Sequence, residues 1–144
     1  MSAIAFSEPD KTVLKRRDEI VERLASLVSS DGLITDRDEC RAYETDALAA
    51  YRKMPLAVVL PISTDEVRSV LKFCHDNDVK VVPRGAGTSL AGGAIPTEDA
   101  IVLGLSRMSR VLEINYDDRF IRVEAGVTNL SITSAVADRG FFYA

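Results

Sequence analysis

The sequence predicts an α+β fold, in which N-terminal helices precede a strand–helix–strand unit and then the start of a mostly antiparallel β region. Three observations carry this prediction. Apolar side chains recur at helical spacing through residues 10–29. Two short apolar runs, 56–61 and 79–83, flank a segment that also has helical spacing. The segments 110–118 and 120–128 alternate apolar and polar residues, as half-buried strands do.

The composition is that of an ordinary globular domain. The 144 residues are enough for one hydrophobic core, and 47% of them are apolar. The net charge of −4 argues against a general nucleic-acid-binding surface. The start has no signal-peptide pattern, and no apolar run reaches transmembrane length. Cys40 and Cys74 form no metal or redox motif, so a reduced, cytoplasmic location is expected.

The N-terminal part, residues 1–54, is predicted to be a helical segment. Pro9 suits the entry of a helix over 10–29, and Gly32 suits its exit. Residues 36–54 are polar and predict one further short helix. Cys40 lies in this polar stretch, which allows it to be exposed.

A second region, residues 55–144, begins with the strand–helix–strand unit. Ser63 is expected to cap the helix while Glu66 reaches back to it, which is a capping box. The helix then runs to about Asn77 between strands near 57–60 and 79–83, which should be parallel because the connections are short. The face expected to be buried contains Val67, Val70, Leu71 and Cys74. The single histidine, His75, is expected on the flank of this helix.

The rest of the chain predicts three more strands and a helix. The strands are 100–108, 110–118 and 120–128, and the last two should pair as a hairpin. Asn129 can cap a helix that Gly140 ends. The final letters "FFYA" place three aromatic residues where nothing follows to cover them. We therefore expect the sequence to be the N-terminal part of a longer protein.

The stretch "PRGAGTSLAGGAIP", residues 83–96, holds four of the eight glycines and directly follows a predicted buried strand. Ligands of parallel sheets bind beyond the carboxyl ends of the strands. Glycine lets another group approach the backbone closely, and successive N–H groups can converge on an anion. Thr88 and Ser89 add hydroxyl donors. Residues 84–93, called the glycine loop below, are predicted to be extended rather than helical, with several amides free of intrachain partners.

Two standard phosphate motifs do not fit the glycine loop. The dinucleotide fingerprint GxGxxG fails because Leu90 stands at its third glycine. The P-loop fails because Gly93 stands where the motif needs lysine. The pattern thus favours an anion or nucleotide site of another kind, and a long glycine turn without a ligand is the structural alternative.

The glycine stretch, with "AVVLPISTDEV" before it and "LGLSRM" and "EAGVT" after it, resembles the FAD-binding domain of FAD-linked oxidases. This is the PCMH-type flavoprotein superfamily that includes vanillyl-alcohol oxidase. Within it, the chain is most similar to the glycolate oxidase D subunit and related D-lactate dehydrogenases. The resemblance covers about residues 43–144 and implies an incomplete PCMH-type fold, cut short at its C-terminal end.

The resemblance also implies where the cofactor binds. Backbone amides of the glycine loop would hold the FAD pyrophosphate, and "EAGV", residues 124–127, would pass near the flavin. The implied cofactor-binding residues are Pro83, Arg84, Gly85, Ala86, Gly87, Thr88, Ser89, Leu90, Gly93 and Gly126. Thr88 stands where some relatives attach the flavin through histidine, so a noncovalent FAD is implied. Two roles stay open for Arg84, which can contact phosphate or brace a neighbouring carboxylate.

The implied activity is oxidation of glycolate or a similar small 2-hydroxy acid. Electrons would pass through FAD to an acceptor, by way of other glycolate oxidase subunits, which could also associate the protein with a membrane. No residue is a good candidate for a catalytic base or a metal site. Because the resemblance implies that the second subdomain and the cap domain also enclose the flavin and substrate, the 144 residues alone are expected to be inactive and to bind FAD weakly or not at all. Two alternatives stay open: a nucleotide- or anion-binding module without catalysis, and an inert truncated product.

Overall fold

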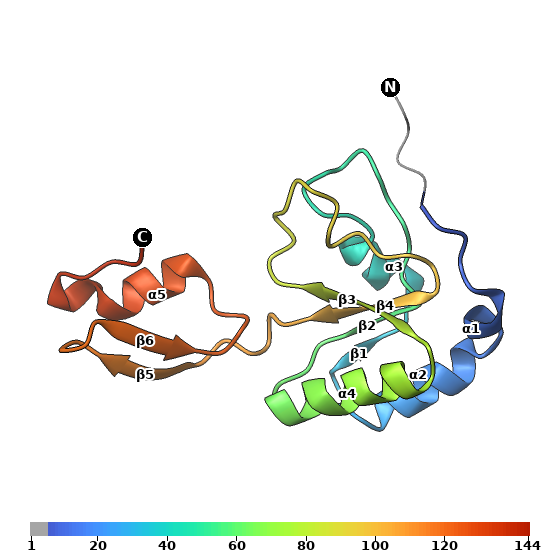
Figure 1. Cartoon of the computed structure of the whole chain (residues 1–144), viewed down its shortest axis with the longest axis horizontal. Coiled ribbons are helices and arrows are strands. Elements are labelled where there is room, and N and C mark those ends of the chain that lie inside the picture. Colours follow the sequence, from blue (N-terminus) through green and yellow to red (C-terminus); the bar gives the residue numbers. More distant parts are fainter. Residues whose placement is uncertain (1–5) are drawn as a thin grey trace.

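The computed structural model describes residues 6–144 in two units (Figure 1). The larger unit is built on a four-stranded sheet, and the smaller one is a two-stranded sheet with a helix on it. Residues 1–5 of the predicted N-terminal segment lie outside the described residues. The prediction about a signal peptide concerns this start of the chain and is not tested by the structure. The boundary between 1–54 and 55–144 stays a prediction.

The elements confirm the predicted α+β class. The α-helices are α1 (Lys11–Lys15), α2 (Arg17–Ala25), α3 (Arg37–Cys40), α4 (Thr64–Asp76) and α5 (Asn129–Val136). The 3-10 helices are η1 (Arg41–Tyr43) and η2 (Ala137–Arg139). The strands are β1 (Leu33–Ile34), β2 (Ala57–Val59), β3 (Lys80–Arg84), β4 (Ala100–Gly104), β5 (Val111–Asn115) and β6 (Phe120–Val123).

The larger sheet has the strand order β1-β2-β4-β3. Both β2 and β3 pair with β4 in parallel, which confirms the predicted parallel strands on either side of α4. Their neighbour β4 lies between them, a position that the sequence pattern did not predict. The short strand β1, also not predicted, closes one edge antiparallel to β2. The carboxyl ends of β3 and β4 therefore lie side by side where the glycine loop begins.

Alternate residues of the central strands face two separate apolar layers. Val58 pairs in register with Val102, and both pack on the side of α3. Their neighbours in β2 and β4 face α1, α2 and α4 on the opposite side. This larger layer includes Ile20, Leu24, Ala57, Val59, Val70, Cys74, Ile101 and Leu103. Burial on both faces explains why these strands read as unbroken apolar runs.

The predicted helix over 10–29 is divided at Arg16 and ends at Ala25. Asp10 caps the first piece by accepting from the Thr12 N–H at 2.7 Å. The Arg16 amide donates to the Val13 carbonyl, a tighter turn than the α-helix has. The Arg16 guanidinium donates to Asn77 of the α4 end at 2.8 Å. The apolar spacing persists across this break, so periodicity alone did not reveal it.

Helix α4 lies where it was predicted, with Ser63 as its N-cap. Ser63 Oγ accepts from the Glu66 N–H at 3.2 Å. The Glu66 carboxylate does not complete a capping box. It accepts from the N–H groups of Ile62 and Ser29 instead, which ties α4 to the chain after α2. The prediction that Leu71 is buried was wrong, because 43% of it is exposed at the edge of the apolar face.

The two cysteines are both buried, Cys40 with 2% and Cys74 with 1% of its surface exposed. Cys74 was predicted in the core, whereas the polar sequence around Cys40 had allowed exposure. Helix α3 turns Cys40 inward, where its thiol donates to the Ile34 carbonyl. Burial raises the pKa of both thiols, that of Cys74 to about 11. Both thiols are therefore protonated at neutral pH and poor nucleophiles.

The second unit contains the predicted hairpin and helix α5. Strands β5 and β6 pair antiparallel, from Val111 opposite Val123 to Asn115 opposite Phe120, and both are shorter than predicted. Thr128, not Asn129, is the N-cap of α5, since Thr128 Oγ1 accepts from the Ser131 N–H at 3.2 Å.

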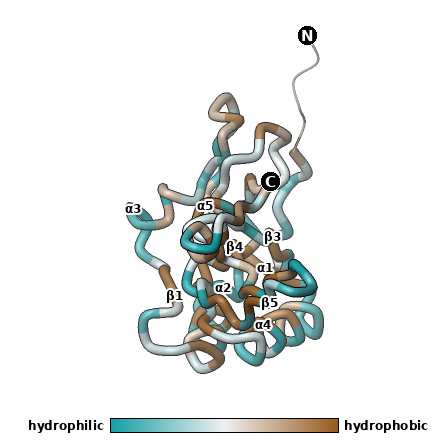
Figure 2. Tube along the Cα trace, turned by 90° about the vertical axis from the view of Figure 1, so that its left-hand side faces the viewer, coloured by the Kyte–Doolittle hydropathy of each residue, from teal (hydrophilic) through white to brown (hydrophobic). Residues whose placement is uncertain are grey.

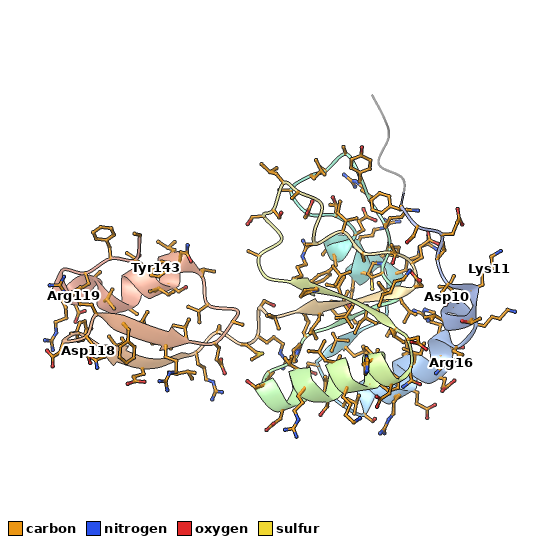
Figure 3. All side chains as sticks on the ribbon, viewed as in Figure 1. Asp10, Lys11, Arg16, Asp118, Arg119 and Tyr143 are labelled. Carbon is orange, nitrogen blue, oxygen red and sulfur yellow. The ribbon has the colours of Figure 1, made fainter. Side chains whose placement is uncertain are left out.

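The chain after α5 folds back against the hairpin. Figure 3 shows Tyr143 and Arg119 in this unit, far from Asp10. Among residues 6–144, no helix combines the length and the apolar character needed to span a bilayer.

Candidate functional site

The glycine loop leaves the sheet at the end of β3, where Arg84 is the last strand residue. No helix forms between β3 and β4, which confirms the predicted extended loop. Gly87 and Gly92 have φ values of +70° and +75°, a region that glycine adopts without strain. Two of the four glycines are thus needed for the path of the backbone itself.

The backbone N–H groups at the start of the loop are free. Within residues 6–144, none of the five amides from Gly85 to Ser89 donates a hydrogen bond to another part of the chain. The next bonded amide is that of Ala91, which donates to Ser89 Oγ at 3.2 Å. A run of unpaired donors at a loop surface is what an anion-binding backbone requires. This confirms the prediction of amides without intrachain partners.

A cleft of about 630 Å³ lies between the glycine loop and the second unit. Its walls come from the loop, from residues 105–110 that join β4 to β5 (the connector), and from the segment that leads into α5. The residues that line it are Gly85, Ala86, Thr88, Ser106, Ser109, Ala125, Gly126, Val127, Thr128, Asn129 and Ser131. All of them are uncharged, and five carry hydroxyl groups. The cleft therefore offers hydrogen bonds without a fixed side-chain charge.

The cleft brings together part of the predicted cofactor set. Gly85, Ala86, Thr88 and Gly126 line it. The others do not line it: Pro83, Arg84, Gly87, Ser89, Leu90 and Gly93. Leu90 is 74% exposed, beyond the cleft.

Arg84 turns away from the cleft. Its guanidinium donates to the carbonyl oxygens of Thr45 at 2.6 Å and Ala42 at 3.5 Å, and it lies 5.5 Å from the centre of the Tyr43 ring. The two roles left open for Arg84 were a phosphate contact and a brace on a carboxylate. Within residues 6–144 it forms no ion pair, and its observed partners are backbone carbonyls and an aromatic ring.

Gly87 packs directly on this guanidinium. A Cβ at Gly87 would overlap the terminal nitrogen of Arg84, and its positive φ would strain any other residue. The loop backbone thus curls over the Arg84 side chain. This contact gives a reason for glycine at position 87 that does not depend on a ligand.

The opposite wall is attached to the connector by close backbone contacts. The Gly126 N–H donates to the Met108 carbonyl at 2.8 Å, and a Cβ at Gly126 would overlap the Leu105 carbonyl. Glu124 accepts from the Arg110 N–H at 2.8 Å and from the Arg110 Nε at 3.0 Å. The guanidinium of Arg110 holds the pKa of the Glu124 carboxyl below its ordinary value. Glu124 is therefore ionised and paired at neutral pH.

Sequence reasoning missed five polar residues of the cleft: Ser106, Ser109, Thr128, Asn129 and Ser131. Ser106 and Ser109 follow the carboxyl end of β4, which is where ligand contacts in parallel sheets arise. The two serines are visible in the sequence "LSRMSR", residues 105–110. Assigning them to the site, however, requires knowing that β4 pairs with β3. Thr128 and Ser131 belong to the cap of α5.

The cleft suits the pyrophosphate of a dinucleotide. Free amides and hydroxyls can donate to phosphate oxygens, and small side chains leave room for close approach. It does not suit acid–base chemistry, because none of its lining residues titrates. Within the described residues 6–144, no three His, Cys, Asp or Glu side chains gather as a metal site.

Comparison with known proteins agrees with this geometry. A family profile described as FAD binding domain matches residues 55–144. The glycolate oxidase subunit GlcD of Escherichia coli (strain K12) is 47% identical over 107 residues, which are 74% of this chain and 21% of that protein. A probable mitochondrial D-2-hydroxyglutarate dehydrogenase of Oryza sativa subsp. indica is 29% identical over 92% of this chain and 23% of that protein.

A solved structure shares the fold. It is the 4-ethylphenol oxidase of Gulosibacter chungangensis, with a TM-score of 0.80 and 26% identity over 93% of this chain and 27% of that one. The likeness confirms the predicted PCMH-type architecture. The chain spans about a fifth of the length of the curated relatives it matches.

Proposed function

The chain belongs to the FAD binding domain family, and from this premise we propose that it is the FAD-binding portion of a flavin-dependent 2-hydroxy-acid dehydrogenase of the glycolate oxidase type. The observation that carries the proposal is the uncharged cleft beside five free loop amides. The named activities of the two relatives support a 2-hydroxy acid as the substrate class.

The loop and the opposite wall have different roles in this proposal. Gly85, Ala86 and Thr88 hold the pyrophosphate through backbone N–H groups and the Thr88 hydroxyl. Ser106 and Ser109 add hydroxyl donors from the connector. The remaining loop residues of the predicted set shape this backbone, and Gly126 brings the second wall close to it. The charge of the phosphates is met by oriented dipoles, as at other glycine-rich anion sites.

The division of chemistry follows from what the cleft contains. Bound FAD supplies the two-electron acceptor for the α-hydrogen of the hydroxy acid. The cleft binds and orients the cofactor, but its lining holds no group that could accept the substrate's hydroxyl proton. Substrate binding and proton transfer belong to the part of the relatives that has no counterpart in these 144 residues. The 144-residue chain alone thus binds FAD weakly and does not oxidise glycolate.

Two further features complete the proposal. FAD is held noncovalently, because Thr88 has no ring nitrogen to attach it. Acid precipitation of the flavin-loaded protein therefore releases the flavin into the supernatant, and flavin left in the pellet would contradict this. Electrons leave through other subunits of a glycolate oxidase, a partner class that the name of the Escherichia coli relative supports.

A charge placed in the cleft tests the proposal. Thr88→Glu sets a carboxylate at an exposed cleft position, and Ser69→Glu adds the same charge on the exposed side of α4. Titration of FAD, followed by flavin fluorescence, should show saturable binding to the parent chain and to Ser69→Glu. Thr88→Glu should weaken it at least about tenfold, which corresponds to 1.4 kcal/mol. Equal affinity in all three, or no saturable signal in the parent chain, would overturn the proposal.

A further inference from the structure

We propose that Arg84 is a positioning residue that fixes the glycine loop by clamping it to the backbone of residues 42–45, rather than a ligand of the phosphates. The proposal rests on the proposed function for its consequence in FAD binding. Its structural part concerns the chain without any ligand. The clamp joins the loop to residues that lie outside the matched range 55–144.

The contacts of the guanidinium are those of a clamp. It donates to two carbonyls, of Thr45 at 2.6 Å and Ala42 at 3.5 Å, and its Cζ lies 5.5 Å from the centre of the Tyr43 ring. On its other side it contacts Gly87, whose missing Cβ makes room for it. The side chain is therefore enclosed between the loop and the turn from 42 to 45.

The turn that receives Arg84 is itself held in shape. Asp46, with 5% of its surface exposed, accepts from the Leu48 N–H at 2.9 Å. The Lys53 N–H donates to the Glu44 carbonyl at 2.8 Å and closes the segment. The two acceptor carbonyls thus belong to a segment with hydrogen bonds of its own, and one side chain links the loop to that segment. In Figure 1 this segment and the glycine loop lie beside each other above the sheet.

The remainder of the loop has little else to order it. The five amides from Gly85 to Ser89 bond to nothing within residues 6–144, and a Cβ at Gly85 would meet no atom within 4 Å. Without Arg84, the free amides would sample many directions, and binding would have to pay their ordering entropy. Clamping before the ligand arrives is preorganisation. It makes arginine specific here, because only the planar guanidinium presents a rigid fork of N–H donors toward both carbonyls, whereas the lysine ammonium is a single point charge on a flexible stem.

Three variants separate a clamp from a phosphate ligand. Arg84→Lys keeps the charge and loses the planar fork, Arg84→Met loses both, and Tyr43→Leu removes only the ring. Arg107→Met is the matched control, because Arg107 also donates to a backbone carbonyl, that of Leu60 at 3.3 Å, and to Ser29 Oγ at 3.3 Å, and within residues 6–144 its side chain forms no hydrogen bond with the glycine loop. The first readout needs no ligand: ¹⁵N relaxation order parameters of the amides of residues 85–88 in the 144-residue chain.

A clamp predicts that these order parameters fall below about 0.6 in both Arg84 variants and stay unchanged in Arg107→Met. Tyr43→Leu should give a smaller fall in the same order parameters. If an Arg84 variant fails to fold, this smaller fall supports the clamp, and unchanged order parameters in Tyr43→Leu contradict it. The second readout is FAD affinity at several salt concentrations. A clamp predicts about a tenfold loss for Arg84→Lys as well as for Arg84→Met, with an unchanged salt dependence in the lysine variant.

A direct phosphate contact by Arg84 predicts a different result. If Arg84→Lys keeps parental loop order and affinity, and only Arg84→Met loses affinity together with part of its salt dependence, Arg84 is a phosphate ligand and the clamp is wrong. Unchanged loop order in every variant overturns it too. If the parent chain binds no FAD, the proposed function fails while the ligand-free relaxation data still decide on the clamp.

Discussion

Gly126 meets the strictest steric limit in the cleft wall. Its Cα faces the Leu105 carbonyl so closely that no side chain fits between them, and its N–H donates to the Met108 carbonyl. Both neighbours are backbone, which cannot rotate aside as a flexible side chain can. The glycine thus sets the distance between the second unit and the connector.

We predict that Gly126→Ala lowers the free energy of unfolding by about 2 kcal/mol, the cost typical of overpacking against a fixed structure. Gly93→Ala is the control, because a Cβ there meets nothing within 4 Å and the backbone is not left-handed. Urea unfolding of the two variants measures the difference. If the urea midpoints of Gly126→Ala and the control are equal, the backbone around Gly126 can move to accept a methyl group, and the prediction is wrong.

Asp99 is a buried carboxylate at the opposite end of the sheet from the cleft. It has no exposed surface, and its Oδ2 accepts from the Lys80 Nζ at 2.7 Å and the Asp10 N–H at 2.9 Å. Burial would raise the pKa of Asp99, but these hydrogen bonds hold it at about 2, below the ordinary 3.8. The folded state thus favours the ionised form.

The pH dependence follows from this direction. Since the pKa of Asp99 is lower in the folded chain, its contribution is complete above about pH 4 and disappears as the pH falls toward 2. It amounts to about 2 kcal/mol. Urea unfolding at pH 6 and pH 2.5 should therefore show a deficit of Asp99→Asn against the parent chain that shrinks in acid. Asp117→Asn, at an exposed position, is the control. A deficit that is equal at both pH values would contradict the ionised pairing.

Helix α4 is the element that the sequence specified most completely. Its spacing, its cap at Ser63 and its end at Asn77 are all local features, and all were found. Local chemistry could not say where the Glu66 carboxylate goes, because its partners Ser29 and Ile62 depend on how α2 packs.

The cap of α4 gives a prediction at this scale. Ser63→Ala should lower the free energy of unfolding by about 1 kcal/mol, because the Glu66 N–H loses its acceptor. Ser63→Asp should retain most of the stability, since its carboxylate is also a good cap. Thermal unfolding of both variants checks this. Equal losses would mean that the serine is needed for something other than its cap.

The elements that were not predicted depend on long-range pairing. The strand β1 has two residues and forms only because β2 offers it an edge. The pattern of 100–108 showed a strand but not its place between β2 and β3. That placement brings Ser106 and Ser109 to the glycine loop, so the missed part of the candidate site has the same cause as the missed topology. The exposure of Leu71 likewise depends on how far neighbouring elements reach over α4.

For the whole molecule, the cleft depends on the relation between its two units (Figure 1). One wall lies at the end of a parallel sheet that has apolar layers on both faces. The other wall is held to the connector by the hydrogen bonds of Glu124 with Arg110 and of Gly126 with Met108. The second unit also exposes aromatic surface, with Phe142 77% and Tyr143 49% accessible. Figure 2 looks toward this unit and shows brown, apolar segments of the chain interspersed with teal, hydrophilic ones.

The central claim is that the glycine loop recognises the pyrophosphate of FAD. The most direct measurement is a titration of the ¹⁵N-labelled 144-residue chain with ADP, adenosine and riboflavin, followed through amide chemical shifts. ADP carries the pyrophosphate, and the other two ligands do not. The account predicts that ADP shifts the amides of residues 85–89 and of Ser106 and Ser109, whereas adenosine and riboflavin leave them in place. Shifts that are equal for all three ligands, or absent at the loop with ADP, would contradict it.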